Sequence, residues 1–213
     1  ANKFPSHFRR PVFDPTRTNL SEKLERYWTQ ERCLAQHLLA DLHITEERVK
    51  LPESNVEENC LCFNYFERGI LINTKYRSAR KHFMMVKGAE LIPYNIDAIL
   101  DSPECIITEG EFDAAAFMTA GRKDVISVPA GAQSNLNWMD RFVETHFEPK
   151  KLIYIAVDED NAGQSLSQEL VRRLGADRCR LVHFGPECKD ANEHLVKYGV
   201  ESLLITLAQA EEI

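Results

Sequence analysis

Three acidic residues follow short apolar runs, and their types and spacing suit the binding of a metal ion. Glu109 comes directly after the run 105–108, and Asp158 and Asp160 come at the end of the run 153–157. If an extended chain continues through Asp158 and Asp160, their carboxylates point to the same side. Carboxylates that converge repel one another. Mg²⁺ or Mn²⁺ would relieve that repulsion, because both ions prefer oxygen ligands.

The elements that must position these acids are predicted to be the strands of a mostly parallel sheet. A short apolar run that stops at acid or glycine, and is followed by a helical pattern, is typical of a buried parallel strand. Repeated alternation of such strands with helices predicts an α/β architecture with helices on both faces of the sheet. Ligands bind such sheets at the carboxyl ends of the strands, where the acids fall. Strands are expected at 105–108, 124–129, 152–157 and 180–184, and helices at 112–120, 136–147 and 164–174.

Lys189 and Asp190 follow the fourth expected strand. Asp190 would then lie at the same edge as the other acids and could complete a metal site, with Lys189 beside it to meet a phosphate. The alternative is that Asp190 caps a helix, because an acid followed by Ala191 and Glu193 is good N-cap chemistry. Both interpretations stay open at this point.

The acidic motifs resemble the signature of Toprim domains, which occur in bacterial primases, topoisomerases, some nucleases and recombination proteins. The resemblance rests on Glu109-Gly110 with Asp113, and on Asp158-x-Asp160 followed by Asn-Ala-Gly. It implies a catalytic role for Glu109, Asp158 and Asp160. It also implies a divalent cation, Mg²⁺ or Mn²⁺, held by these three residues together with Asp190. Whether Glu109 ligates metal or transfers a proton is left open.

A basic stretch precedes the acidic motifs. Residues 60–86 alternate apolar and polar side chains, which predicts an antiparallel meander with turns near 67–69 and 78–80. Between positions 75 and 89 there are five basic residues and no acid. Aromatic residues are interleaved with the cations. One interpretation is a solvated strand face; the favoured one is a groove for phosphates, because the acidic site follows in the chain. The basic residues are Lys75, Arg77, Arg80, Lys81 and Lys87.

This stretch is similar to the basic subdomain that precedes the Toprim domain in primases, most of all in phage primase-helicases and Twinkle-like proteins. The resemblance implies a DNA primase core that makes short RNA primers from ribonucleoside triphosphates on single-stranded DNA, with a replicative helicase domain or protein as partner. Two alternatives stay open, a Toprim nuclease and a non-catalytic single-stranded DNA-binding or loading module. The nucleotide-binding or template-binding residues implied are Lys75, Arg77, Lys81, Lys87 and Lys189.

The chain of 213 residues is expected to have three parts. Residues 1–20 form an extended basic arm or linker, 21–100 a smaller basic α+β subdomain, and 101–213 the Toprim domain with C-terminal helices. Within the second part, Ser21 is predicted to cap a helix, and a further helix is expected over 33–42.

Composition narrows the class of protein. The net charge of −7 excludes a uniformly basic coat, although a local basic groove remains compatible with it. No run reaches the roughly 18 apolar residues that a membrane span needs, so no membrane partner is expected. Six cysteines in a chain of this length do not suggest a disulfide scaffold, and a cytoplasmic location is the expectation.

Overall fold

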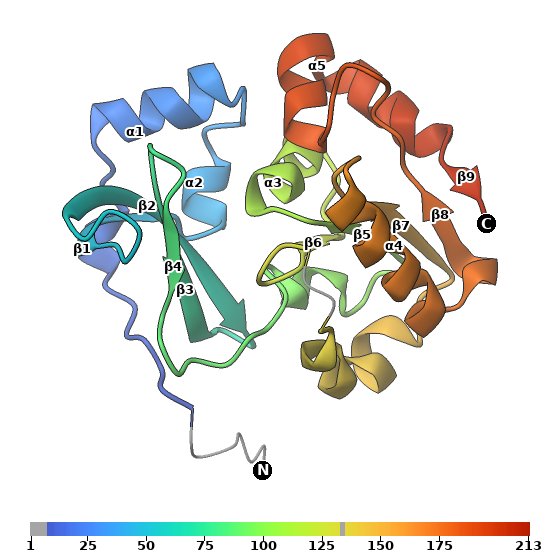
Figure 1. Ribbon diagram of the computed structural model, residues 1–213, viewed down its shortest axis with the longest axis horizontal. Coiled ribbons are helices and arrows are strands. Elements are labelled where there is room, and N and C mark those ends of the chain that lie inside the picture. The colour runs from blue at the N-terminus through green and yellow to red at the C-terminus, as the bar shows by residue number, and fades with distance from the viewer. Residues whose placement is uncertain (1–7, 133–134) are drawn as a thin grey trace.

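The computed structural model describes residues 8–132 and 135–213, whose strands form two sheets (Figure 1). The first sheet is antiparallel, in the order β1-β2-β3-β4, and the second is mostly parallel, in the order β6-β5-β7-β8-β9. This confirms the expected α/β fold with an antiparallel meander ahead of it. The strands are β1 (Thr45–Lys50), β2 (Glu57–Glu67), β3 (Ile70–Ser78), β4 (Phe83–Met85), β5 (Glu104–Thr108), β6 (Val125–Ser127), β7 (Leu152–Ala156), β8 (Cys179–Leu181) and β9 (Glu211–Glu212).

The first sheet is the predicted meander with one additional strand. Arg68 and Gly69 turn the chain between β2 and β3 with φ angles of 51° and 73°. Strand β1 was not predicted, because its sequence Thr-Glu-Glu-Arg-Val-Lys is charged on both faces. Charged side chains are typical of edge strands, which must avoid pairing with other chains.

The helical segments near the N-terminus agree only partly with the prediction. Ser21 caps α1 (Glu22–Arg26), accepting the backbone N–H of Leu24, and the π-helical η2 (Tyr27–Glu31) continues it. The single helix expected over 33–42 is wrong. Cys33 adopts a left-handed φ of 54°, which ends the helical path, and only α2 (Leu38–Asp41) forms beyond it.

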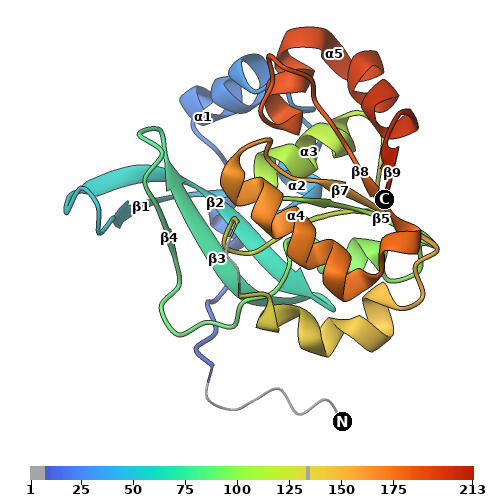
Figure 2. The same cartoon turned by 45° about the vertical axis from the view of Figure 1, so that its right-hand side comes forward.

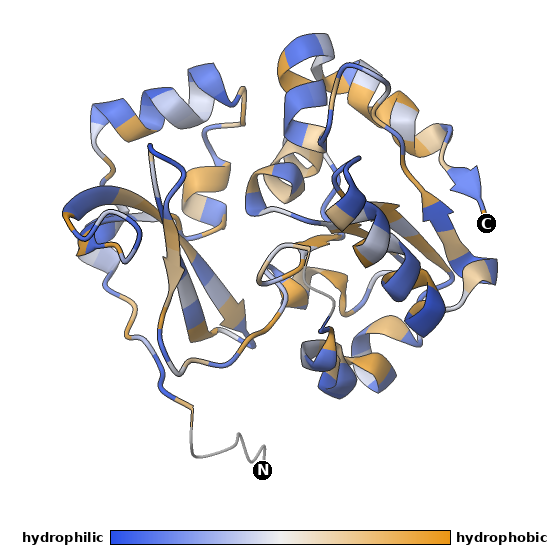
Figure 3. Cartoon of the chain, viewed as in Figure 1, coloured by the Kyte–Doolittle hydropathy of each residue, from blue (hydrophilic) through white to orange (hydrophobic). Residues whose placement is uncertain are grey.

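The second sheet aligns the strand ends that carry the acids. Thr108, the last residue of β5, pairs in register with Ser127 at the end of β6 and with Ala156 at the end of β7. Because the three strands are parallel, their carboxyl ends meet at one edge. Strands β5, β6 and β7 are mostly buried and appear mainly orange in Figure 3, as expected for a sheet covered on both faces.

Helices cover both faces of this sheet (Figures 1 and 2). The helix α3 (Glu111–Thr119) packs with α5 (Ala191–Ala208) on one side, and α4 (Asn161–Leu174) lies on the other. The continuous helix expected at 136–147 is instead a 3₁₀ segment, η4 (Asn137–Phe142), followed by a π-helical turn, η5 (Val143–Phe147). The short antiparallel edge strand β9 was not predicted. Over the described residues, no helix combines the length and apolarity that crossing a membrane requires.

Candidate active site

A cavity of about 330 Å³ lies at the carboxyl edge of the second sheet and is also lined by strand β3 of the first. It brings together most of the residues that the sequence singled out, although they are far apart along the chain. Asp160 and Lys87 do not line it. The predicted residues that do line it are Lys75, Arg77, Lys81, Glu109, Asp158, Lys189 and Asp190.

Glu109 lies one residue beyond β5, where burial makes its charge unfavourable. One of its carboxylate oxygens, Oε2, is buried and has no hydrogen-bond partner in the described part of the chain. Burial, together with the negative charges of Asp158 and Asp160, raises the pKa of Glu109 from 4.5 to about 7, and backbone hydrogen bonds from Asp158 and Ala132 partly oppose this rise. The site therefore holds a carboxyl group that exchanges its proton near neutral pH.

Asp158 is paired with Lys189 across the same cavity. The Lys189 ammonium lies 3.1 Å from Asp158 Oδ2 and 3.2 Å from Asp190 Oδ2, so it bridges the two carboxylates. Burial raises the pKa of Asp158, whereas Lys189 lowers it. Burial alone would lower the pKa of Lys189, but Asp158 and Asp190 outweigh that effect and raise it. Lys189 is therefore held in its charged form by the two acids.

Asp160 has a different position from the one expected. Strand β7 ends at Ala156, so the extended chain that would point Asp158 and Asp160 to the same side does not continue through them. Asp160 instead caps α4: its Oδ1 accepts the backbone N–H groups of Ala162 and Gly163, each at 2.9 Å. This hydrogen bonding fixes the start of α4 beside the cavity.

Two glycines pack closely against the acids. A Cβ on Gly163 would lie 1.9 Å from the carbonyl oxygen of Asp158, so the first turn of α4 can approach Asp158 only without a side chain there. A Cβ on Gly110 would lie 2.8 Å from Asp113 Oδ2. The φ of Gly110 is an ordinary −118°, so space for the Asp113 carboxylate, and not an unusual turn conformation, accounts for this glycine.

Asp190 caps a helix and also lies at the acidic edge of the cavity. Its Oδ1 accepts the backbone N–H of Glu193 at 2.8 Å and caps α5, and the residue also lines the cavity. Asp113 is buried behind it and accepts the backbone N–H of Asn192 at 3.0 Å. Burial raises the pKa of Asp113 well above its usual value, and the nearby Asp190 carboxylate adds to the rise.

Lys75 reaches the cavity from β3 but is not a free cation. Its ammonium contacts both carboxylate oxygens of Glu111, at 2.9 and 3.0 Å, and both side chains are largely buried. The hydroxyl of Tyr65 donates to the same carboxylate. Sequence reasoning missed Glu111, although it lies two residues after Glu109. The partner on β3 that gives Glu111 its role could not be read from the sequence.

Two guanidinium groups stack on Phe112, in the first turn of α3. The guanidinium carbon of Arg32 lies 4.4 Å from the ring centroid and that of Arg77 lies 5.0 Å from it. Arg32 also donates to the side chain of Asn192 at 2.9 Å, so it links η2 to α5. Arg32 was missed because nothing near it in the sequence marks it, and only folding brings it to the cavity.

The carboxylates have the oxygen atoms that a divalent cation prefers, but their side chains do not form a complete metal-binding site in this arrangement. The buried, unpartnered oxygen of Glu109 and the raised pKa values of Glu109 and Asp158 are what a cation would relieve. Yet within residues 8–132 and 135–213, no three His, Cys, Asp or Glu side chains lie together closely enough to hold a metal ion. Lys189 occupies the position between Asp158 and Asp190.

Known proteins resemble the chain over most of its length. The Primase homolog protein of Arabidopsis thaliana is 33% identical over an alignment of 186 residues, and the match covers 78% of this chain and 55% of that protein. The Twinkle homolog protein, chloroplastic/mitochondrial, of the same plant is 32% identical over 186 residues, 78% of this chain and 26% of that protein. The chain thus spans about half the length of the first relative and about a quarter of the second.

Solved structures with low sequence identity share the fold. The primase fragment of the bacteriophage T7 primase-helicase superposes with a TM-score of 0.73 at 18% identity, covering 97% of this chain and 81% of that one. The DnaG catalytic core gives a TM-score of 0.68 at 14% identity, covering 92% and 76%. The family model described as Toprim-like matches residues 106–195, from β5 into α5. This chain therefore contains a Toprim-like domain within a fold that it shares with primase cores.

Proposed function

We propose that this chain is the catalytic core of a DNA primase, which joins ribonucleoside triphosphates on a single-stranded DNA template. The observation that carries the proposal is the opposition, in one cavity, of an acidic rim and a basic wall. The acids come from the ends of parallel strands, and the basic groups come mainly from the preceding antiparallel sheet. The relatives named as primase and Twinkle homologs and the shared fold of primase cores support this choice.

Glu109, Asp158 and Asp190 are the residues proposed to hold Mg²⁺ or Mn²⁺, with Asp160 beside them at the start of α4. A divalent ion at this place would stabilise the charges on the attacking and leaving oxygens of nucleotide transfer. For Asp158 and Asp190 to act as ligands, the Lys189 ammonium must move from between them. Lys189 is then free to meet the phosphates of the incoming nucleotide.

The basic side chains are proposed to bind and orient nucleotide and template. Arg77 and Arg32 present guanidinium groups over Phe112, and such planar groups suit phosphate oxygens. Lys81 is exposed beside them on the wall of the cavity. Lys75 is held against Glu111 and is proposed to shape the wall. Lys87 lies outside the cavity, so it can contact the template only where the single-stranded DNA extends beyond the cavity.

The remaining expectations are proposals of the same kind. We take residues 21–100 and 101–213 as two subdomains, since each contains one of the two sheets. Of the expected arm 1–20, residues 1–7 lie outside the described residues, and the described part includes the short η1 (Pro15–Thr18). A helicase domain or protein is the proposed partner, because the T7 relative in fold is a fragment of a primase-helicase. The predicted cytoplasmic location stays a prediction, and the name of one relative offers the chloroplast or mitochondrion as the alternative.

The decisive experiment measures template-dependent incorporation of labelled ribonucleotides on single-stranded DNA with Mg²⁺. Asp158→Asn should abolish incorporation, whereas Glu201→Gln, an exposed acid on α5, should leave it unchanged. Cleavage of the DNA in place of synthesis would support the nuclease alternative. Binding of DNA with neither reaction would support the non-catalytic module.

A second measurement addresses the basic wall. Arg77→Gln should weaken binding of single-stranded DNA or nucleotide and should reduce the slope of log affinity against log salt by about 1, the size expected for one phosphate contact. Lys123→Gln, which lies outside the cavity, is the matched control. An unchanged slope in the double variant Arg77→Gln/Lys81→Gln would remove this wall from the proposed binding surface.

A further inference from the structure

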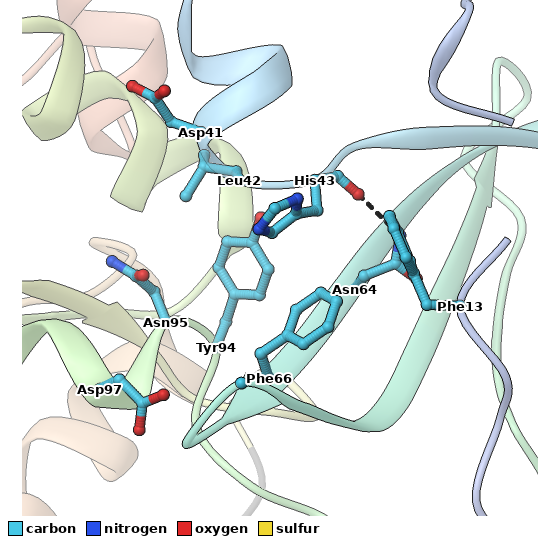
Figure 4. A pocket seen from close by; sticks show the side chains of 10 residues that line it. Phe13, Asp41, Leu42, His43, Asn64, Phe66, Tyr94, Asn95 and Asp97 are labelled. Atoms are coloured by element: carbon cyan, nitrogen blue, oxygen red, sulfur yellow. Dashed lines mark hydrogen bonds between the residues drawn. The ribbon is translucent and has the colours of Figure 1, made fainter. Parts of the chain in front are cut away.

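A second cavity, of about 370 Å³, opens between the first sheet and the segment that leads into η3 (Ile96–Ile99), at a place that the proposed catalytic site does not use (Figure 4). It shares no lining residue with the acidic cavity. Its walls come from the loop before β1, the end of β2 and the segment that leads into η3. The cavity is therefore separate from the chemistry proposed above and needs its own explanation.

Aromatic rings form one wall of this cavity. The rings of Phe13, His43 and Phe66 pack edge to face or tilted, with centroids 5.1 to 5.6 Å apart. Tyr94 lines the cavity as well, and Figure 4 shows its ring beside those of His43 and Phe66. Phe13 and Phe66 are half-buried and His43 is exposed, so these side chains keep surface open to the cavity. The face of an aromatic ring carries the negative part of its quadrupole.

The charged groups around this wall are all acidic. Asp41, at the end of α2, and Asp97, in η3, line the cavity and lie at opposite ends of it in Figure 4. Asp97 accepts the backbone N–H of Arg68 at 2.6 Å, and no ion pair forms at Asp41 within the described residues. Among those residues, no lysine or arginine side chain lines the cavity. A nucleic-acid backbone would be repelled here, whereas a cation would be attracted by both the rings and the carboxylates.

We propose that this cavity binds an arginine side chain presented by a basic segment of a partner protein. A guanidinium group is planar, so it can stack on an aromatic face while its edge donates hydrogen bonds to carboxylates. Lysine offers only a point charge and fits this combination less well. The side-chain amide nitrogen of Asn64 already donates hydrogen bonds to the carbonyl of His43 and to Thr45 Oγ1, so it is not a free donor that could take up the carboxylates of the cavity.

The test titrates the whole chain with a short capped peptide that has one central arginine, and follows backbone amide shifts by NMR. The matched probe replaces arginine with citrulline, which keeps the shape and removes the charge. We expect shifts confined to 41–43, 64–69 and 94–97 and binding of the arginine peptide at least about fivefold tighter than that of the citrulline peptide. Asp41→Asn and Asp97→Asn should each weaken binding about two- to fivefold, while Glu201→Gln leaves it unchanged.

Equal binding of the two peptides would overturn the proposal, because an apolar cavity without charge recognition would explain it. Shifts spread over other acidic surfaces would also overturn it. A third probe, a nucleoside without phosphate, tests whether the cavity binds a nucleic-acid base. If the nucleoside shifts the same amides and binds more tightly than the arginine peptide, the cavity would be assigned to a base and not to a protein segment. None of these outcomes depends on primase activity, so the two proposals can fail separately.

Discussion

The buried pair between Lys75 and Glu111 gives a prediction whose size follows from the structure. The side chain of Lys75 is 10% exposed and that of Glu111 is 2% exposed, and the ammonium lies 2.9 and 3.0 Å from the two carboxylate oxygens. At an effective dielectric constant of about 20, two unit charges 3 Å apart attract by about 5 kcal/mol. Glu111→Gln keeps the volume and an acceptor for Tyr65 but leaves the Lys75 charge buried without its counter-charge. We expect the free energy of unfolding to fall by about 3–5 kcal/mol.

The assay is urea denaturation at neutral pH, followed by tryptophan fluorescence, which reports on the fully buried Trp28. The double variant Lys75→Met/Glu111→Gln removes the stranded charge and should be more stable than Glu111→Gln alone. Lys87→Met, an exposed cation outside the cavity, should change stability by less than about 0.5 kcal/mol. A loss below about 1 kcal/mol in Glu111→Gln, or a double variant that loses the sum of both single effects, would refute the reasoning.

Three further predictions concern the acidic edge. Because the folded protein raises the pKa of Glu109 from 4.5 to about 7, the native state binds its proton more tightly than the unfolded chain, so the free energy of unfolding should fall as pH rises through that window. In Glu109→Gln the free energy of unfolding, measured by denaturation between pH 4.5 and 7.5, should fall less steeply with pH. An equal dependence on pH in both proteins would contradict the raised pKa of Glu109. Gly163→Ala should cost about 1–3 kcal/mol of stability and weaken activity, because its Cβ would overlap the carbonyl of Asp158; wild-type stability and activity would show that α4 shifts freely. Asp160→Ala should cost about 1 kcal/mol and Asp160→Asn much less, because Asn also caps helices well; equal losses in thermal unfolding would mean that charge, and not capping, sets the contribution of Asp160 to stability.

Local patterns in the sequence were sufficient for the order of elements around the acids. The apolar runs that end at Glu109 and Asp158 predicted two parallel neighbours, and β5 and β7 pair in that way. A buried parallel strand must be apolar along its whole length, so its pattern survives without knowledge of its partners. Strands β1 and β9 lack an apolar run, because most of their residues are charged, and they were therefore not recognised.

The tertiary structure decided which partner each charged group meets. The sequence put Lys75 in a basic stretch without acids, yet folding pairs it with Glu111 at the start of α3. It predicted that Asp158 and Asp160 point to the same side of an extended strand, whereas β7 ends at Ala156 and Asp160 caps α4. The residue types and strand-end positions of the acids are local properties and were readable from the chain. The distances between charges depend on contacts between residues 30 to 160 positions apart, such as Arg32 with Asn192, and only the packed fold sets them.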